Sequence, residues 1–210
     1  MQVQPIGRQE WVIRAVDLVL AAGALVFFAP LFLLVALLVK LEDGGPVMYA
    51  QERIGRGGKP FRCLKFRTMA VDAEAQLRDL LARDPEARRE WERDHKLRDD
   101  PRITQVGRFL RASSLDELPQ LWNIVVGEMS VVGPRPIVQA EAPRYGRHFK
   151  RYCAVRPGLT GLWQVSGRND VSYRERVVMD VAYVRARCLC LDLKIIVRTV
   201  PAVLLRRGSY

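Results

Sequence analysis

Two adjacent carboxylates, Asp116 and Glu117, are the side chains of this sequence best suited to chemistry. They lie in the stretch RASSLDELPQLWN, within a strongly basic chain. An acid pair can hold Mg²⁺ together with substrate phosphates, and a carboxylate can itself attack phosphorus. Arginine binds phosphate well because its forked N–H donors match phosphate oxygens. The cations that could face the pair are Lys65, Arg111, Arg135 and Arg168.

These residue types predict phosphoryl transfer, but a structural interpretation of the acid pair is also open. Ser113 or Ser114 resembles a helix N-cap, and acids in the first turn of a helix favour its macrodipole. An isolated pair of acids would be explained in this way. The surrounding cations favour the chemical interpretation.

Composition narrows the partners without choosing among them. The chain has 210 residues with 34 Lys and Arg against 23 Asp and Glu, so its formal net charge is +11. Such a charge calls for nucleic acid, a phospholipid surface or a phosphorylated substrate. The four cysteines form no CxxC pattern and the chain has two histidines, which argues against a zinc site.

An uncharged apolar run from Leu18 to Val39 is long enough for a membrane helix, which needs about 20 apolar residues. Pro30 divides it, and a proline inside a helix kinks or breaks that helix. The two arms reach roughly 18 Å and 14 Å, and neither alone spans a hydrocarbon core of about 30 Å. A kinked single crossing and a re-entrant hairpin both remain open. Positive charge on both flanks favours the hairpin.

The remaining chain predicts an α+β protein, mostly α. The segments VMYAQERI and FRCLKFRTM, separated by the glycine turn GRGG, predict a small β-hairpin. Residues 71–100 predict a solvated helical segment broken near Pro85, and 99–130 predict two helices joined by a turn. The segment VVGPRPI indicates a rigid turn that holds Arg135 between two prolines. Residues 173–205 predict amphipathic helices that suit an anionic membrane surface or ordinary packing.

At this point the chain resembles a known family. The segments KFRTM (65–69), SLDELPQLWNIVVGEMSVVGPRP (114–136), RPGLTGLWQVSGRND (156–170) and LDLKIIVRT (191–199) resemble those of the bacterial sugar transferases, the monotopic phosphoglycosyl transferases. The resemblance extends from about Trp11 to the C-terminus and looks most like the undecaprenyl-phosphate galactose phosphotransferases of exopolysaccharide synthesis. Larger relatives carry an extra N-terminal transmembrane domain, and we expect this chain to be the short form.

The resemblance implies a reaction and a site. Members of the family transfer a sugar 1-phosphate, here with galactose or glucose favoured, from a UDP-sugar to undecaprenyl phosphate and release UMP. By motif, Asp116 is the nucleophile of a covalent phosphosugar intermediate and Glu117 is its partner, with Mg²⁺ beside both. The implied contacts to phosphate and uridine diphosphate are Lys65, Arg111, Arg135 and Arg168. Asp180 and Asp192 also match family positions, where we expect structural ion pairs.

The family also implies a topology. Its anchor is a re-entrant helix broken at a proline with both ends cytoplasmic, so residues 11–40 are the expected anchor and 41–210 the catalytic domain on the cytoplasmic face of the inner membrane. Pro30 matches the break, but Ala29 stands where many relatives have serine. We expect no nucleic acid partner, and the sequence leaves a homodimer open.

Two rival functions remain to be tested. A non-catalytic, membrane-anchored basic module would explain the charge and the apolar run, but not Asp116 and Glu117 beside LPQLWN. A phosphotransferase that uses a CDP-alcohol would carry several spaced aspartates on membrane helices. This sequence has one apolar run and no such array.

Overall fold

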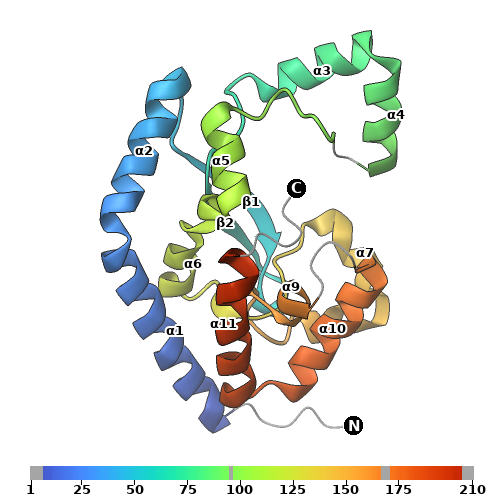
Figure 1. The fold of residues 1–210 in the computed structure, drawn as a ribbon. Helices are drawn as coiled ribbons and strands as arrows, with labels where there is room; N and C mark the ends of the chain where they lie inside the picture. Colours follow the sequence, from blue (N-terminus) through green and yellow to red (C-terminus); the bar gives the residue numbers. More distant parts are fainter. Residues whose placement is uncertain (1–6, 95–96, 167–170, 205–210) are drawn as a thin grey trace.

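The computed structural model describes residues 7–94, 97–166 and 171–204, which form helices and two two-stranded sheets. The longer helices are α1 (Gly7–Phe27), α2 (Ala29–Asp43), α3 (Ala73–Arg83), α4 (Pro85–Asp94), α5 (Gln105–Ser113), α6 (Gln120–Val126), α10 (Tyr173–Ala186) and α11 (Leu189–Leu204). The shorter ones are η1 (Arg56–Gly58), η2 (Leu115–Glu117), η3 (Gln139–Glu141), α7 (Ala142–Tyr145), η4 (Gly146–His148), α8 (Phe149–Tyr152) and α9 (Leu162–Ser166). The strands are β1 (Met48–Ile54), β2 (Pro60–Phe66), β3 (Ser130–Val132) and β4 (Gly158–Thr160). Figure 1 shows the helices around strands β1 and β2. The predicted α+β, mostly helical class is confirmed.

Strands β1 and β2 form the predicted antiparallel hairpin. Its register pairs Gln51 with Cys63 and Arg53 with Phe61. Residues opposite each other in an antiparallel pair share a face, and side chains alternate along each strand. Arg53, Cys63 and Lys65 therefore project from the same face, which is the face of the candidate site.

A second, parallel pair of strands, β3 and β4, was not predicted from the sequence. It pairs Ser130 with Gly158. The backbones at Gly133 and Gly158 approach so closely that a Cβ on Gly158 would lie 2.0 Å from the Gly133 nitrogen. Only glycine fits such an approach. The rigid turn that carries Arg135 follows β3, so the pairing brings Arg135 beside Gly158.

The apolar N-terminal segment forms two helices, α1 and α2, that bend by 61° between Phe27 and Ala29. Phe28 has φ −89° and ψ 4°, and Pro30 lies in the first turn of α2, where its missing N–H is tolerated. Within the described residues, no single helix has the length and apolar character to cross a membrane. The bent pair meets those two criteria when its helices are taken together.

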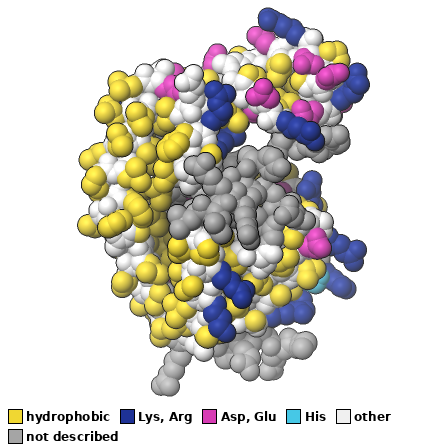
Figure 2. All heavy atoms as spheres, in the orientation of Figure 1, with side chains coloured by type: hydrophobic (Ala, Val, Ile, Leu, Met, Phe, Trp, Pro, Cys, Tyr) yellow, Lys and Arg dark blue, Asp and Glu magenta, His cyan; other side chains and the backbone are white. Residues whose placement is uncertain are grey.

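One face of the bent pair packs on the body of the protein. Ile13, Asp17 and Ala21 of α1 and Val35 and Val39 of α2 are buried, at the three- to four-residue spacing of a helix face. Most of the remaining surface of the pair is exposed and apolar, as Figure 2 shows on its left side. Its large exposed side chains are Trp11, Val12, Leu18, Val19, Leu20, Val26, Phe27, Leu33, Leu34, Leu37, Leu38 and Leu41. A patch of this kind marks a surface for an apolar partner.

Polar side chains fasten α1 to the body. Arg14 donates hydrogen bonds to the carbonyl oxygens of Ile124 (2.7 Å) and Val125 (3.0 Å) at the end of α6. The Asp17 carboxylate accepts one from the Ser130 hydroxyl at 2.7 Å. The bent pair is therefore tied to the helix that follows the two candidate carboxylates.

The charged segment 71–100 forms an arm of two helices, α3 and α4, that stands away from the body (Figure 1). The predicted interruption near Pro85 is confirmed, because α3 ends at Arg83 and α4 begins at Pro85. The Asp84 carboxylate accepts a 2.8 Å hydrogen bond from the Glu86 N–H at the start of α4. No residue of α3 is buried, as expected for a solvated arm.

Two buried aspartates of the C-terminal helices have tyrosine partners. The Tyr145 hydroxyl donates to Asp180 at 2.7 Å, and the Tyr183 hydroxyl donates to Asp192 at 2.8 Å. Among the residues that the structure describes, neither aspartate forms the expected ion pair, and each accepts a hydrogen bond from a neutral hydroxyl. Burial raises the pKa of Asp180 to about 7.

Candidate active site

The two carboxylates lie in η2, a single turn between α5 and α6. Ser114 precedes them with φ 59° and ψ 15°, and its N–H donates to the Arg111 carbonyl. Ser114 takes the expected N-cap position directly before η2, but its side chain makes no capping bond, and the same residue is the left-handed C-cap of α5. The left-handed residue reverses the chain, as is common at helix ends.

Lys65 of β2 lies between the two carboxylates. Its ammonium nitrogen is 2.7 Å from Glu117 Oε1 and 3.4 Å from Asp116 Oδ2. The side chain of Lys65 is 24% exposed, that of Glu117 is 28% exposed and that of Asp116 is 12% exposed. Because water is largely kept from them, their attraction is screened less than at an open surface.

Burial and charge move the pKa values of the two acids in opposite directions. Burial raises the pKa of Asp116, which the attraction of Lys65 offsets only in part. Burial also acts to raise the pKa of Glu117, but Lys65 and Arg135 outweigh it and lower that pKa. Burial would lower the pKa of Lys65, yet the two carboxylates raise it. The site therefore holds Glu117 ionised against Lys65 and leaves Asp116 as the more basic carboxylate.

Asn123 of α6 sets the position of Lys65 relative to the acids. Its side-chain amide donates to the Arg62 carbonyl at 2.8 Å and accepts from the Leu64 N–H at 3.0 Å. A third bond, of 2.6 Å, joins it to the Glu128 carboxylate. The bonds to Arg62 and Leu64 hold α6 against the edge of β2 that does not pair with β1.

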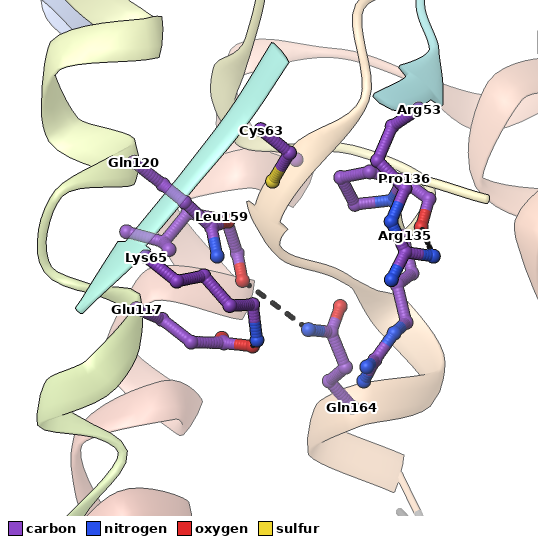
Figure 3. Close-up of a pocket in the computed structure, with 10 residues that line it drawn as sticks. Arg53, Cys63, Lys65, Glu117, Gln120, Arg135, Pro136, Leu159 and Gln164 are labelled. Carbon is purple, nitrogen blue, oxygen red and sulfur yellow. Dashed lines mark hydrogen bonds and ion pairs between the residues drawn. The ribbon is translucent and has the colours of Figure 1, made fainter. Parts of the chain in front are cut away.

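Lys65 and Glu117 face two arginines, Arg53 and Arg135, across a small cavity (Figure 3). The cavity has a volume of about 20 Å³, which is room for about one water molecule. Gln164 donates a 3.2 Å hydrogen bond to the Leu159 carbonyl at its wall. The other lining residues are Cys63, Gln120, Pro136 and Gly158. A larger anion would bind at the mouth of this cavity, where the cations converge.

The two arginines are held differently. Arg53 donates to the Pro136 carbonyl at 3.1 Å and to the Gln51 side chain at 2.6 Å, so its guanidinium is fixed. Arg135 is exposed, and its guanidinium lies 5.9 Å from the ring centre of the buried Trp163. A cation over an aromatic face keeps its N–H donors available for an anion.

The structure gathers most of the residues predicted for the site. Asp116, Glu117, Lys65 and Arg135 converge on one region. Arg111 does not line the cavity; its Nε donates to the Thr68 hydroxyl at 2.9 Å, although its charge still favours ionised Asp116. The prediction for Arg168 falls outside the described residues.

Sequence reasoning missed Arg53, Gln120 and Gln164. The hairpin register places Arg53 on the face of Lys65, so the alternation of the two strands was a usable signal. Gln120 lies three residues after Glu117, at the spacing of neighbours on a helix. Gln164 lies within the segment RPGLTGLWQVSGRND that carries the family resemblance, and its hydrogen bond to Leu159 of β4 holds it at the cavity wall.

Comparisons with known proteins identify the family of this chain. Residues 8–206 match the family model "Bacterial sugar transferase". The chain is 52% identical over 208 residues to the exopolysaccharide production protein ExoY of Rhizobium meliloti, covering 99% of this chain and 91% of that protein. It is 50% identical over 197 residues to the undecaprenyl-phosphate galactose phosphotransferase of Salmonella typhimurium, covering 94% and 41%. It is 42% identical over 205 residues to the UDP-glucose:undecaprenyl-phosphate glucose-1-phosphate transferase of Caulobacter vibrioides, covering 94% and 71%.

The chain therefore belongs to the bacterial sugar transferase family. The resemblance drawn from its motifs is confirmed, and the chain is an enzyme of this type. The non-catalytic basic module that the composition also allowed is not favoured.

Proposed function

We propose that this enzyme transfers a hexose 1-phosphate from a UDP-sugar to undecaprenyl phosphate and releases UMP, as the first membrane step of exopolysaccharide or glycoconjugate synthesis. The observation that carries the proposal is Lys65, held between Asp116 and Glu117 beside a cavity that Arg53 and Arg135 also face. A diphosphate donor and a lipid phosphate repel each other, so fixed cations are needed to bring them together. The relative named for galactose is more similar than the relative named for glucose, which favours galactose.

Asp116 is the nucleophile in this proposal. One of its carboxylate oxygens bonds to the sugar-linked phosphorus, and the bond from that phosphorus to the bridging oxygen breaks as UMP leaves with the electron pair. An oxygen of undecaprenyl phosphate then attacks the same phosphorus and displaces Asp116. The raised pKa of Asp116 supports this role, because a more basic carboxylate is a better nucleophile. Glu117 keeps Lys65 charged and in place.

The same carboxylates are the residues that would hold Mg²⁺. The described residues contain no group of three or more His, Cys, Asp or Glu side chains placed for a metal. Two adjacent carboxylates nevertheless fit Mg²⁺, which commonly takes one or two carboxylates and completes its shell with water and substrate phosphates. When bound, the ion would neutralise phosphate charge. Lys65 contacts one oxygen of each acid, so each carboxylate has a second oxygen to offer.

The exposed apolar face of α1 and α2 supports a re-entrant anchor at the cytoplasmic face of the inner membrane. The two helices, of 21 and 15 residues, are roughly 30 Å and 22 Å long, and the bend turns the chain before it could cross as one rod. Exposed apolar residues continue along nearby helices: Phe109, Trp122, Val126, Leu193, Val197 and Val200. Their position supports helices that lie in the interface.

The deciding experiment is UMP release by purified protein in lipid, with Mg²⁺, undecaprenyl phosphate and a panel of UDP-sugars. We expect release with one UDP-hexose and none from Asp116→Asn. Intact mass without lipid acceptor should show one hexose phosphate on the wild type and none on the variant. Undiminished UMP release from Asp116→Asn would remove Asp116 as nucleophile, and no release with any donor would remove the proposed reaction.

A further inference from the structure

A second cluster of cations lies outside the candidate active site. It lines an open hollow of about 380 Å³, a volume within the range of small-ligand sites. The side chains around the hollow are Arg147, His148, Lys150, Arg151 and Arg185. None of them lines the catalytic cavity, and none is a carboxylate.

The hollow has a rigid base. Its residues come from η4, α8 and α10, which pack on a buried cluster that includes Tyr145, Tyr152 and Val181. The Tyr152 hydroxyl donates to the Ile54 carbonyl at 2.8 Å and ties α8 to the hairpin. Backbone and core packing, rather than charge attraction, therefore hold these cations together.

His148 occupies an unusual position within the cluster. Its Nε2 lies 3.5 Å from Arg147 Nε and its Nδ1 lies 3.4 Å from Arg151 Nη1. A neutral imidazole can accept a hydrogen bond on only one of its two nitrogens. Partial burial and the charges of Arg147, Arg151 and Arg185 all lower the pKa of His148. An anion in the hollow would relieve this repulsion and give the arginines an acceptor.

We propose that this hollow binds a small soluble anion that carries a doubly charged phosphate group. Guanidinium groups match phosphate oxygens in pairs, and several converging cations suit a multiply charged ligand better than a single carboxylate. Figure 1 shows α10, which carries Arg185 of the hollow, on the side of the molecule opposite α1 and α2. That placement favours a solute over a lipid headgroup. The proposal does not depend on the sugar or on the lipid acceptor.

The test uses the full chain in detergent with inorganic pyrophosphate as the probe. The chain has two histidines, so His95→Gln leaves the ring signals of His148 as the only ones in a histidine-labelled NMR spectrum. We expect pyrophosphate to shift these signals saturably and to raise the pKa of His148 by about one, because a nearby anion favours the imidazolium.

The matched variants remove equal charge from two places. Arg151→Gln with Arg185→Gln should weaken pyrophosphate binding at least about tenfold, the expected loss for two charge-assisted contacts. Arg78→Gln with Arg89→Gln, on the exposed arm, should leave it unchanged. Equal weakening by both pairs, or no shift of the His148 signals at millimolar pyrophosphate, would overturn the site. A response to vesicles with anionic lipid but not to pyrophosphate would overturn the choice of a soluble ligand.

Discussion

Asn123 and Leu64 are joined as residues of neighbouring strands would be: the Leu64 N–H donates to Asn123 Oδ1 at 3.0 Å. Leu64 immediately precedes Lys65, and Asn123 lies on the helix that follows Glu117. Asn123 is only 1% exposed, so water does not replace this bond when it is lost. One buried amide therefore fixes the distance between the site's central cation and its carboxylates.

We predict that Asn123→Leu slows turnover more than it affects substrate binding. The variant leaves the Leu64 N–H and the Arg62 carbonyl unsatisfied, which costs about 1–3 kcal/mol each in the free energy of unfolding. A small displacement of Lys65 should lower kcat by up to about 100-fold with a smaller change in KM. Gln76→Leu, which removes an exposed hydrogen bond to Asp72, is the control. A folded Asn123→Leu enzyme with normal kcat would show that the amide does not position Lys65.

Lys65 should set the acid limb of the pH–rate profile. Its charge lowers the pKa values of Asp116 and Glu117, and Asp116 has to be ionised to attack phosphorus. In Lys65→Met both pKa values rise. As the pH is lowered, this variant should therefore lose activity at a higher pH than the wild type does. Lys65→Arg keeps the charge and should leave the limb near its original position. UMP release measured across pH in all three enzymes checks this, and an unmoved limb in Lys65→Met would contradict it.

Ser114 should tolerate glycine and reject a β-branched residue. Its φ of 59° is unfavourable for residues with a Cβ, by roughly 1–2 kcal/mol, and most unfavourable for β-branched ones. Ser114→Gly should therefore keep or slightly increase the unfolding free energy, and Ser114→Val should lower it. Ser113→Val, one residue earlier within α5, should cost less. Denaturant unfolding of the three variants measures these free energies. If Ser114→Val and Ser113→Val lowered the unfolding free energy equally, the left-handed conformation of Ser114 would not be the cause of the loss.

The features read correctly from the sequence depend on nearby residues. Two β-rich segments on either side of a glycine turn predicted the hairpin, and Pro30 and Pro85 predicted two interruptions. The parallel pair β3–β4 was missed because each strand has three residues and close contact between two glycines sets its register. Closeness in sequence brought the charge of Arg111 near Asp116, but it could not show that Arg111 Nε donates to Thr68, and a contact of Arg111 with substrate stays a prediction. Long-range packing, which leaves no local pattern, decided these cases.

Asp180 should make the protein less stable as pH rises. Burial raises its pKa from 3.8 to about 7. Below pH 3.8 the carboxyl is neutral in both the folded and the unfolded state, so burying it costs no stability. Above about pH 7 the folded state has to bury the charge, and the full cost in unfolding free energy is present. Asp180→Asn keeps an acceptor for the Tyr145 hydroxyl and has no charge to bury. Between pH 5 and pH 8 the wild type should lose about 2–3 kcal/mol relative to this variant. Unfolding free energies that change in parallel across this range would contradict the prediction.

Pro30→Ala should change how the N-terminal helices enter the membrane. The alanine restores an N–H for the Val26 carbonyl, and with it a continuous helix from α1 into α2 that is long enough to cross a core of about 30 Å. In the wild type we expect an N-terminal tag and the catalytic body on the same side of inverted vesicles, as judged by protease access. In Pro30→Ala a fraction of the tags should become protected, whereas Pro201→Ala, inside α11, should leave them accessible. Tags that stay accessible in Pro30→Ala would mean that the packing of Val35 and Val39 against the body, rather than the proline, maintains the bend.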